Sequence, residues 1–259
     1  EFLLSCHVCH PSLCNDNLSG IALLTFLGKM LKTKKSLRHS YRLLFIPATI
    51  GSIAWLWKNE KTVHRIKHGL VATCVGDGGR FTYKRSRHGE AEVDRAVVHS
   101  LGISKNDHLI KDFFPYGYDE RQYCSPGFDM PVGCLMRSPH GEYAEYHTSA
   151  DNLDFVRAEY LQQSLEQYIS VIEIIEGNNT YVSKNMKCEP QLGKRGLYKV
   201  IGGDDGQGDQ QLAMLWVLNL ADGQHTLLDM AERSGMDFRL LRKTADTLCE
   251  SGLLEVRRD

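Results

Sequence analysis

Four His and Asp residues stand where predicted strands end or predicted helices begin. His7 closes an apolar run, Asp16 opens the helix that follows, Asp77 comes after another apolar run, and His147 precedes a long helical segment. Strand ends that feed loops at one edge of an α/β sheet converge in space, so these side chains can meet. Two imidazoles and two carboxylates suit zinc, with a position left for water. The alternative is that they are unrelated capping and surface residues.

Continuous apolar runs predict the elements that position these residues. Runs of strand length, typical of strands covered on both faces, span 2–8, 41–47 and 69–75. Apolar residues recur at helical spacing over 21–31, and one long amphipathic helix is predicted over 151–176. Segment 83–141 is less regular and is predicted to form loops over an active face. The pattern indicates an α/β layered sheet.

A change in composition after residue 177 indicates a second domain. We predict a first domain over 1–202, a Gly/Asp-rich linker over 203–209, and a compact helical domain over 210–259. The order helix, helix, turn, helix, strand in the last segment is that of a winged helix. Residues 209–259 carry six Lys and Arg but nine Asp and Glu. Since DNA-binding units are usually basic where they meet phosphate, we predict a packing or protein-interaction role rather than nucleic-acid binding.

The overall composition excludes several classes of protein. The 259 residues carry 31 Lys and Arg against 32 Asp and Glu, which gives no bulk attraction for nucleic acid or anionic lipid. No run approaches the roughly 20 apolar residues of a membrane span. Eight Cys are too few for a disulfide scaffold and indicate reduced thiols in a cytoplasmic protein. Because the chain opens inside an apolar run, we expect the N-terminal part of the first domain to be missing.

The segments LLSCH (3–7), NDNLSG (15–20) and EYHTSAD (145–151) carry the most specific pattern. They resemble the metal motifs of the zinc aminopeptidase superfamily. Further segments resemble one bacterial branch, labelled as polysaccharide-biosynthesis proteins with an aminopeptidase-like domain and a C-terminal winged helix. Those segments are 7–12, 47–52, 83–87, 119–122 and 188–193. The resemblance covers residues 1–259 and implies a three-layer αβα mixed sheet of the zinc-exopeptidase kind.

The resemblance also implies roles for particular residues. Asp16 would be a bridging ligand, with one zinc firmly bound and a second left open, and the terminal ligands would be His7, Asp77 and His147. In the superfamily an Asp stands two residues after the first His, and here Cys9 takes that place. His10 follows at once and is an alternative ligand or a substrate contact.

One departure from the superfamily pattern bears on activity. In active relatives, the strand corresponding to 41–47 ends in a Glu that acts as general base, usually followed by a metal-binding Glu. This sequence has Ala48 and Thr49 there. A methyl group accepts no proton, and loss of a positioned base typically costs about 10²–10⁴-fold in rate. Three functions stay open: a zinc-dependent aminopeptidase-like hydrolase of amide or peptide bonds, a metal-binding pseudoenzyme, and a ligand-sensing regulator with a winged-helix interaction domain.

Other polar residues are candidates for contacts with substrate. Tyr146 can donate a hydrogen bond to a developing oxyanion, with packing as the alternative. Arginines can hold a substrate carboxylate or phosphate, and carboxylates can hold a substrate amino group. These candidates are Arg85, Arg87, Asp119, Glu120 and Arg121. The expected partner is a small peptide or amino-acid derivative; a homo-oligomer is left open.

Overall fold

A six-stranded sheet organises the first part of the chain in the computed structural model, which describes residues 1–197 and 207–257. Neighbouring strands are parallel except for β6 and β4, which are antiparallel. The strand order is β2 (Tyr41–Ile46), β1 (Phe2–His7), β3 (His68–Ala72), β6 (Val132–Met136), β4 (Phe81–Lys84) and β5 (His108–Lys111). The mixed sheet predicted from the sequence is confirmed.

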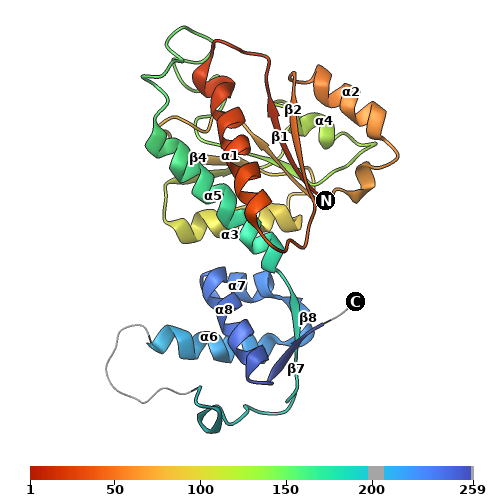
Figure 1. Ribbon diagram of the computed structural model, residues 1–259, viewed down its shortest axis with the longest axis vertical. Helices are drawn as coiled ribbons and strands as arrows, with labels where there is room; N and C mark the ends of the chain where they lie inside the picture. Colours follow the sequence, from red (N-terminus) through yellow and green to blue (C-terminus); the bar gives the residue numbers. More distant parts are fainter. Residues whose placement is uncertain (198–206, 258–259) are drawn as a thin grey trace. The chain divides into compact units, whose positions relative to one another are not determined.

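Helices cover both faces of this sheet (Figure 1). One face carries α1 (Ser19–Thr33), α3 (Glu92–Ser104) and α5 (Ala158–Gly177). The other carries α2 (Ile50–Asn59) and the short α4 (Glu120–Tyr123). The three-layer αβα arrangement is therefore present, with β1 in its interior.

Polar bonds reinforce the apolar contacts of the sheet on both faces. β1 is buried at every position, and its Ser5 hydroxyl lies 2.9 Å from the Tyr123 hydroxyl of α4. On the opposite face, Tyr168 of α5 donates to the carbonyls of Val71 and Leu135, at 3.1 and 2.7 Å. These contacts fix the strands whose carboxyl ends feed the site loops.

Two predictions about local structure are wrong. Segment 83–141, predicted as loops, contains α3, β5, α4 and β6, and Phe81–Lys84 forms β4. The long helix begins at Ala158 rather than at 151, because residues 151–157 form turns in which the buried Asp151 carboxylate accepts backbone bonds from another segment. That carboxylate is thereby available to the site instead of capping a helix.

The described residues of the second compact unit, Gly177–Asp259, form three α-helices, one short 3-10 helix and a three-stranded sheet. The α-helices are α6 (Gln207–Leu220), α7 (Leu227–Ser234) and α8 (Phe238–Glu250), and the strand order is β8 (Asp222–Thr226), β7 (Thr180–Ser183) and β9 (Leu254–Val256). The units divide after Glu176, earlier than the predicted boundary at 202, because β7 pairs with β8 and β9. Of the predicted linker 203–209, residues 203–206 lie outside the described residues and 207–209 belong to α6.

A capping box fixes the start of α7. The Thr226 side chain accepts from the Asp229 N–H at 3.2 Å, and the Asp229 carboxylate accepts from the Thr226 N–H at 2.6 Å. We expect Thr226→Ala to lower the free energy of unfolding of this unit by about 1 kcal/mol, measured by urea titration of Trp216 fluorescence. Thr247→Ala, inside α8, is the control and should change it by less than about 0.5 kcal/mol. Equal effects of the two substitutions would contradict the capping role.

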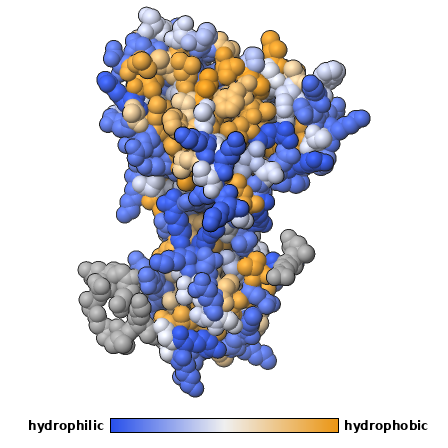
Figure 2. Space-filling model, viewed as in Figure 1, coloured by the Kyte–Doolittle hydropathy of each residue, from blue (hydrophilic) through white to orange (hydrophobic). Residues whose placement is uncertain are grey.

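Apolar side chains are exposed among the polar residues on the surface of the first unit, as Figure 2 shows for one face of the molecule. On α2, Ile50 and Trp57 are 75% and 79% exposed, and Ile53 is 51% exposed. β2 is an edge strand, and its Phe45 is 40% exposed. Among the described residues, none of the helices combines the length and apolar character that a membrane span requires.

Candidate metal centre

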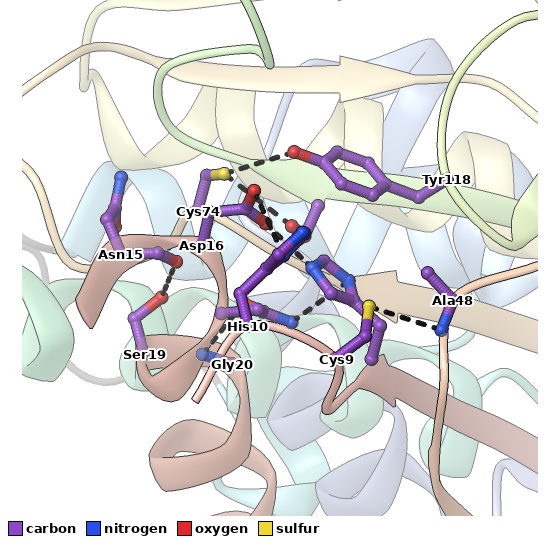
Figure 3. Close-up of polar contacts among 12 residues, drawn as sticks. Cys9, His10, Asn15, Asp16, Ser19, Gly20, Ala48, Cys74 and Tyr118 are labelled. Carbon is purple, nitrogen blue, oxygen red and sulfur yellow. Dashed lines mark hydrogen bonds and ion pairs between the residues drawn. The ribbon is translucent and has the colours of Figure 1, made fainter. Parts of the chain in front are cut away.

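Three imidazoles surround one buried carboxylate at the carboxyl end of β1. His7 Nε2 lies 2.7 Å from Asp16 Oδ1, His147 Nε2 lies 3.0 Å from Asp16 Oδ2, and His10 Nδ1 lies 3.5 Å from the same Oδ2. His7 and Asp16 are fully buried, whereas the His10 and His147 side chains are 32% and 48% exposed. Figure 3 shows His10 beside Asp16, with Cys74 and Tyr118 close by. The cluster therefore has a closed side and a side open to solvent.

Asp16 is held by residues on three segments. The Asp151 carboxylate accepts the backbone N–H groups of Asn15 and Asp16, at 2.5 and 3.0 Å. The peptide bond between Asp16 and Asn17 is cis. Asn17 Nδ2 donates to the Ala72 carbonyl at 2.9 Å, which ties this turn to the end of β3. The direction of the Asp16 carboxylate is thus set by backbone bonds on both sides.

Gly20 is required by the same turn. Its N–H donates to Asn17 Oδ1 at 3.1 Å, and a Cβ at this position would lie 2.5 Å from that oxygen and 2.6 Å from the Ala72 carbonyl oxygen. Any larger residue would displace the start of α1. The Asn-Leu-Ser-Gly part of the NDNLSG segment therefore forms the turn that holds Asp16 in place.

Electrostatics keep the Asp16 carboxylate ionised. Burial raises its pKa, but the hydrogen bond from His7 and the charges of His7, His10 and His147 outweigh burial and lower it. Burial and the charge of Asp16 raise the pKa of the nearby Cys74 thiol to about 12, so this sulfur stays protonated. An ionised carboxylate is the form in which Asp16 would bind a metal.

The donor set fits zinc. The ligand atoms of His10, Asp16 and His147 lie within 4.8 Å of one another, and so do those of His7, Cys9 and His10. His10 Nδ1 is buried and has no hydrogen-bond partner among the described residues. Imidazole nitrogen with carboxylate oxygen is a common zinc donor set, and the half-exposed histidines leave the open side that a catalytic site needs. The residues that would hold the ion are His7, His10, Asp16 and His147.

Asp77, expected to be a terminal ligand, belongs to neither group of metal-binding side chains found within the described residues. Its Oδ1 accepts from the Gly79 N–H at 2.7 Å and from Ser138 Oγ at 2.6 Å. Its Oδ2 accepts from Asn15 Nδ2 at 2.8 Å. Both oxygens therefore accept hydrogen bonds, and the bond to Oδ2 ties Asp77 to the Asn15 turn. Its role as a terminal ligand stays a prediction.

The structure brings some predicted substrate residues to the centre and not others. Tyr146 stacks on His147, with ring centroids 4.0 Å apart, and burial raises the pKa of its hydroxyl to about 12. Arg121 lies near the Tyr116 ring, 5.9 Å from its centroid. Three of the remaining predicted residues have ionic partners in the chain: Arg85 with Glu90, Arg87 with Asp129, and Glu120 with Lys84. The fourth, Asp119, accepts hydrogen bonds from Thr49 and Ser52.

Ala48 is near the centre, and its N–H donates to Cys9 Sγ at 3.4 Å. It therefore lies beside the segment that joins His7 to His10, although its side chain is inert. Two residues that sequence reasoning missed also shape the site. Tyr118 stacks on the His7 ring at a centroid distance of 5.0 Å, and Asp151 holds the backbone of Asp16. Asp151 is the last residue of the EYHTSAD motif, so the motif could have indicated its role. No motif in the sequence points to Tyr118.

Fold and site together define an aminopeptidase-like αβα protein with a C-terminal winged helix. The first unit is similar in fold to a zinc aminopeptidase from Bacillus subtilis, with a TM-score of 0.54, 18% identity, and coverage of 67% of this chain and 45% of the other. Residues 1–178 match the family model described as a domain of unknown function, DUF4910, and the chain belongs to that family. Residues 179–256 match the winged helix-turn-helix model, which confirms the predicted winged helix.

Two proteins of Clostridium acetobutylicum are similar to this chain along almost its whole length. The chain is 52% identical over 256 residues to a protein named as a candidate polysaccharide biosynthesis protein with an aminopeptidase-like domain, covering 99% of this chain and 58% of that one. A crystal structure of a C. acetobutylicum protein named as a candidate peptidase superposes with a TM-score of 0.91 at 50% identity, covering 99% and 57%. The chain therefore spans less than two thirds of the length of these relatives.

Proposed function

We propose that this chain is a zinc-dependent, aminopeptidase-like hydrolase that acts on an amide bond of a small peptide or amino-acid derivative. The observation that carries the proposal is the convergence of His7, His10 and His147 on the Asp16 carboxylate, at 2.7–3.5 Å. The aminopeptidase-like fold supports the reaction class, and the name of the C. acetobutylicum relative agrees with it.

The open side of the centre is where substrate would enter. When bound, zinc would act there as a Lewis acid on the amide carbonyl. His10 and His147 face this side, since their side chains are partly exposed. Tyr146 packs flat against His147 and remains a neutral phenol, so it can donate a hydrogen bond to the carbonyl oxygen as negative charge develops.

Ala48 favours a second candidate function. Its methyl group cannot take a proton from water at the end of β2, where active relatives are expected to carry a Glu. A centre with metal ligands and no base would bind an amine- or carboxylate-bearing ligand without cleaving it. The winged-helix unit could then report that ligand to a partner, as in a ligand-sensing regulator.

Zinc titration followed by an amidase assay separates these candidates. We expect the purified chain to bind zinc with high affinity and to hydrolyse aminoacyl-p-nitroanilides, to lose that activity in a chelator, and to regain it with added zinc. Zinc content is measured by mass spectrometry and hydrolysis by absorbance. Zinc binding without hydrolysis would support the pseudoenzyme, and a chain that binds no zinc would overturn both candidates.

A further inference from the structure

We propose that Asp119 is the general base of this site, replacing the carboxylate that Ala48 lacks. This inference rests on the proposed hydrolase function and deepens it. Asp119 follows Tyr118 in the loop before α4 and is fully buried. Three observations carry the assignment: where its carboxylate is anchored, which of its oxygens is unused, and which residues surround it.

The Asp119 carboxylate is anchored beside Ala48. Its Oδ1 accepts from the backbone N–H of Thr49 at 2.7 Å and from Ser52 Oγ at 2.9 Å. Thr49 directly follows Ala48 and precedes α2. A carboxylate supplied from the loop before α4 therefore lies against the β2–α2 turn, the same turn from which a Glu at 48 would act.

Only one of the two oxygens is used in this anchoring. Both hydrogen bonds go to Oδ1, whereas Oδ2 is buried without a hydrogen-bond partner in the described part of the chain. A residue needed only to cap α2 has no reason to bury a second, unsatisfied oxygen, since such burial costs about 1–3 kcal/mol. A water molecule held there would satisfy Oδ2, and that water is the nucleophile that a hydrolase needs.

The surroundings of Asp119 connect it to the metal centre. The neighbouring Tyr118 stacks on His7, and the charges of His7 and Asp119 interact closely enough to influence the pKa of Asp119. Burial nevertheless raises that pKa above its ordinary value, in part offset by the bonds from Thr49 and Ser52 and by His7. A carboxylate of raised basicity accepts a proton more readily than an exposed one.

The reaction balances with Asp119 as the only proton carrier. Oδ2 takes a proton from water while the water oxygen forms a bond to the amide carbonyl carbon. The C–N bond then breaks and the amine nitrogen takes the proton from Oδ2. The products are a carboxylic acid and a free amine, and Asp119 returns to its starting state.

Asp119→Asn tests this role, because the amide oxygen can keep the bonds from Thr49 and Ser52 while basicity is lost. We expect kcat/KM for an aminoacyl-p-nitroanilide to fall by about 10²–10⁴-fold. Introducing Ala48→Glu into the same variant places a carboxylate on the adjacent turn and should recover part of the loss. Asp94→Asn is the control, since Asp94 is equally buried but bonds Tyr83 and Ser86 instead. Asp119→Asn with unchanged kcat/KM would overturn the assignment.

A second readout does not depend on turnover. Acetohydroxamic acid binds zinc as its anion, so it loses a proton when it binds. Calorimetry of the zinc-loaded protein in buffers of different ionisation enthalpy measures how much of that proton is released to the buffer. In the wild type we expect Asp119 to keep the proton and little to reach the buffer; Asp119→Asn should release about one proton. Release of a full proton by the wild type would overturn the base assignment. A wild type that retains the proton but hydrolyses no amide would overturn the proposed function alone.

Discussion

Replacing Asp16 by Asn is expected to lower zinc affinity by about 100-fold or more. Even the loss of a residue that only orients a metal ligand typically lowers metal affinity by about 10–100-fold. Asp16 carries the negative charge that three imidazoles surround. The amide has nearly the same shape and keeps an acceptor for His7, so the packing of this buried site is preserved. Affinity is measured by competition with a chromophoric chelator, and folding is checked by circular dichroism.

Asp77→Asn is the discriminating control for that experiment. Asp77 has the same side chain, is 1% exposed, and supports the Asn15 turn through Asn15 Nδ2. Since it lies outside the described metal-binding groups, its substitution should reduce zinc affinity by less than about tenfold while lowering thermal stability. If Asp77→Asn abolished zinc binding as fully as Asp16→Asn, the ligand set assigned to the centre would be wrong.

Part of this site was readable from the sequence because its ligands belong to short local motifs. His7 ends a buried strand, and Asp16 lies in a turn whose Asn and Gly have fixed tasks in the structure. The part played by Asp77 could not be derived from the sequence, and its role as a ligand stays a prediction. Its distance from the centre depends on how the chain turns after β3, where Cys74 has a φ of 48°, and on the Ser138 hydroxyl from a distant segment.

The region 83–141 shows where pattern reading failed. Its strands have only four or five residues, too few to show an apolar period, and α4 has four. α3 did carry a readable signal, since Val93, Ala96, Val97 and Leu101 recur at helical spacing and are fully buried. The role proposed for Asp119 cannot be derived from the sequence, because it depends on a contact between residues 49 and 119.

Lys84→Met is expected to lower the free energy of unfolding of the first unit by about 3–5 kcal/mol, the largest effect on stability anticipated for this chain. Lys84 Nζ is 2.7 Å from Glu120 Oε1, and both side chains are at most 2% exposed. The same ammonium donates to the carbonyls of Phe114 and Tyr116, at 3.0 and 2.7 Å. Methionine fills the space but leaves the buried Glu120 carboxylate without its cation, and the carbonyls of Phe114 and Tyr116 lose the ammonium donor.

Lys111→Met is the matched control, because Lys111 pairs with Glu142 at the surface, where the side chains are 26% and 54% exposed. Removing an exposed pair should cost at most about 1 kcal/mol. Urea unfolding followed by circular dichroism compares the two variants. If Lys84→Met lowered the free energy of unfolding by no more than Lys111→Met, the buried pair of Lys84 and Glu120 would not stabilise the first unit.

The ion pair of Lys84 and Glu120 also connects the stability of the first unit to the geometry of the metal centre. Glu120 adjoins Asp119, and Glu120 Oε1 accepts the backbone N–H of Tyr118 at 3.2 Å, so the pair anchors the loop that lies against His7. The double variant Lys84→Met/Glu120→Gln should cost less than the sum of its single variants by about 1–3 kcal/mol, because it leaves no buried charge uncompensated. It should still lose activity, since the loop has lost its anchor. Full activity in the double variant would mean that Tyr118 and Asp119 are positioned by α2 alone.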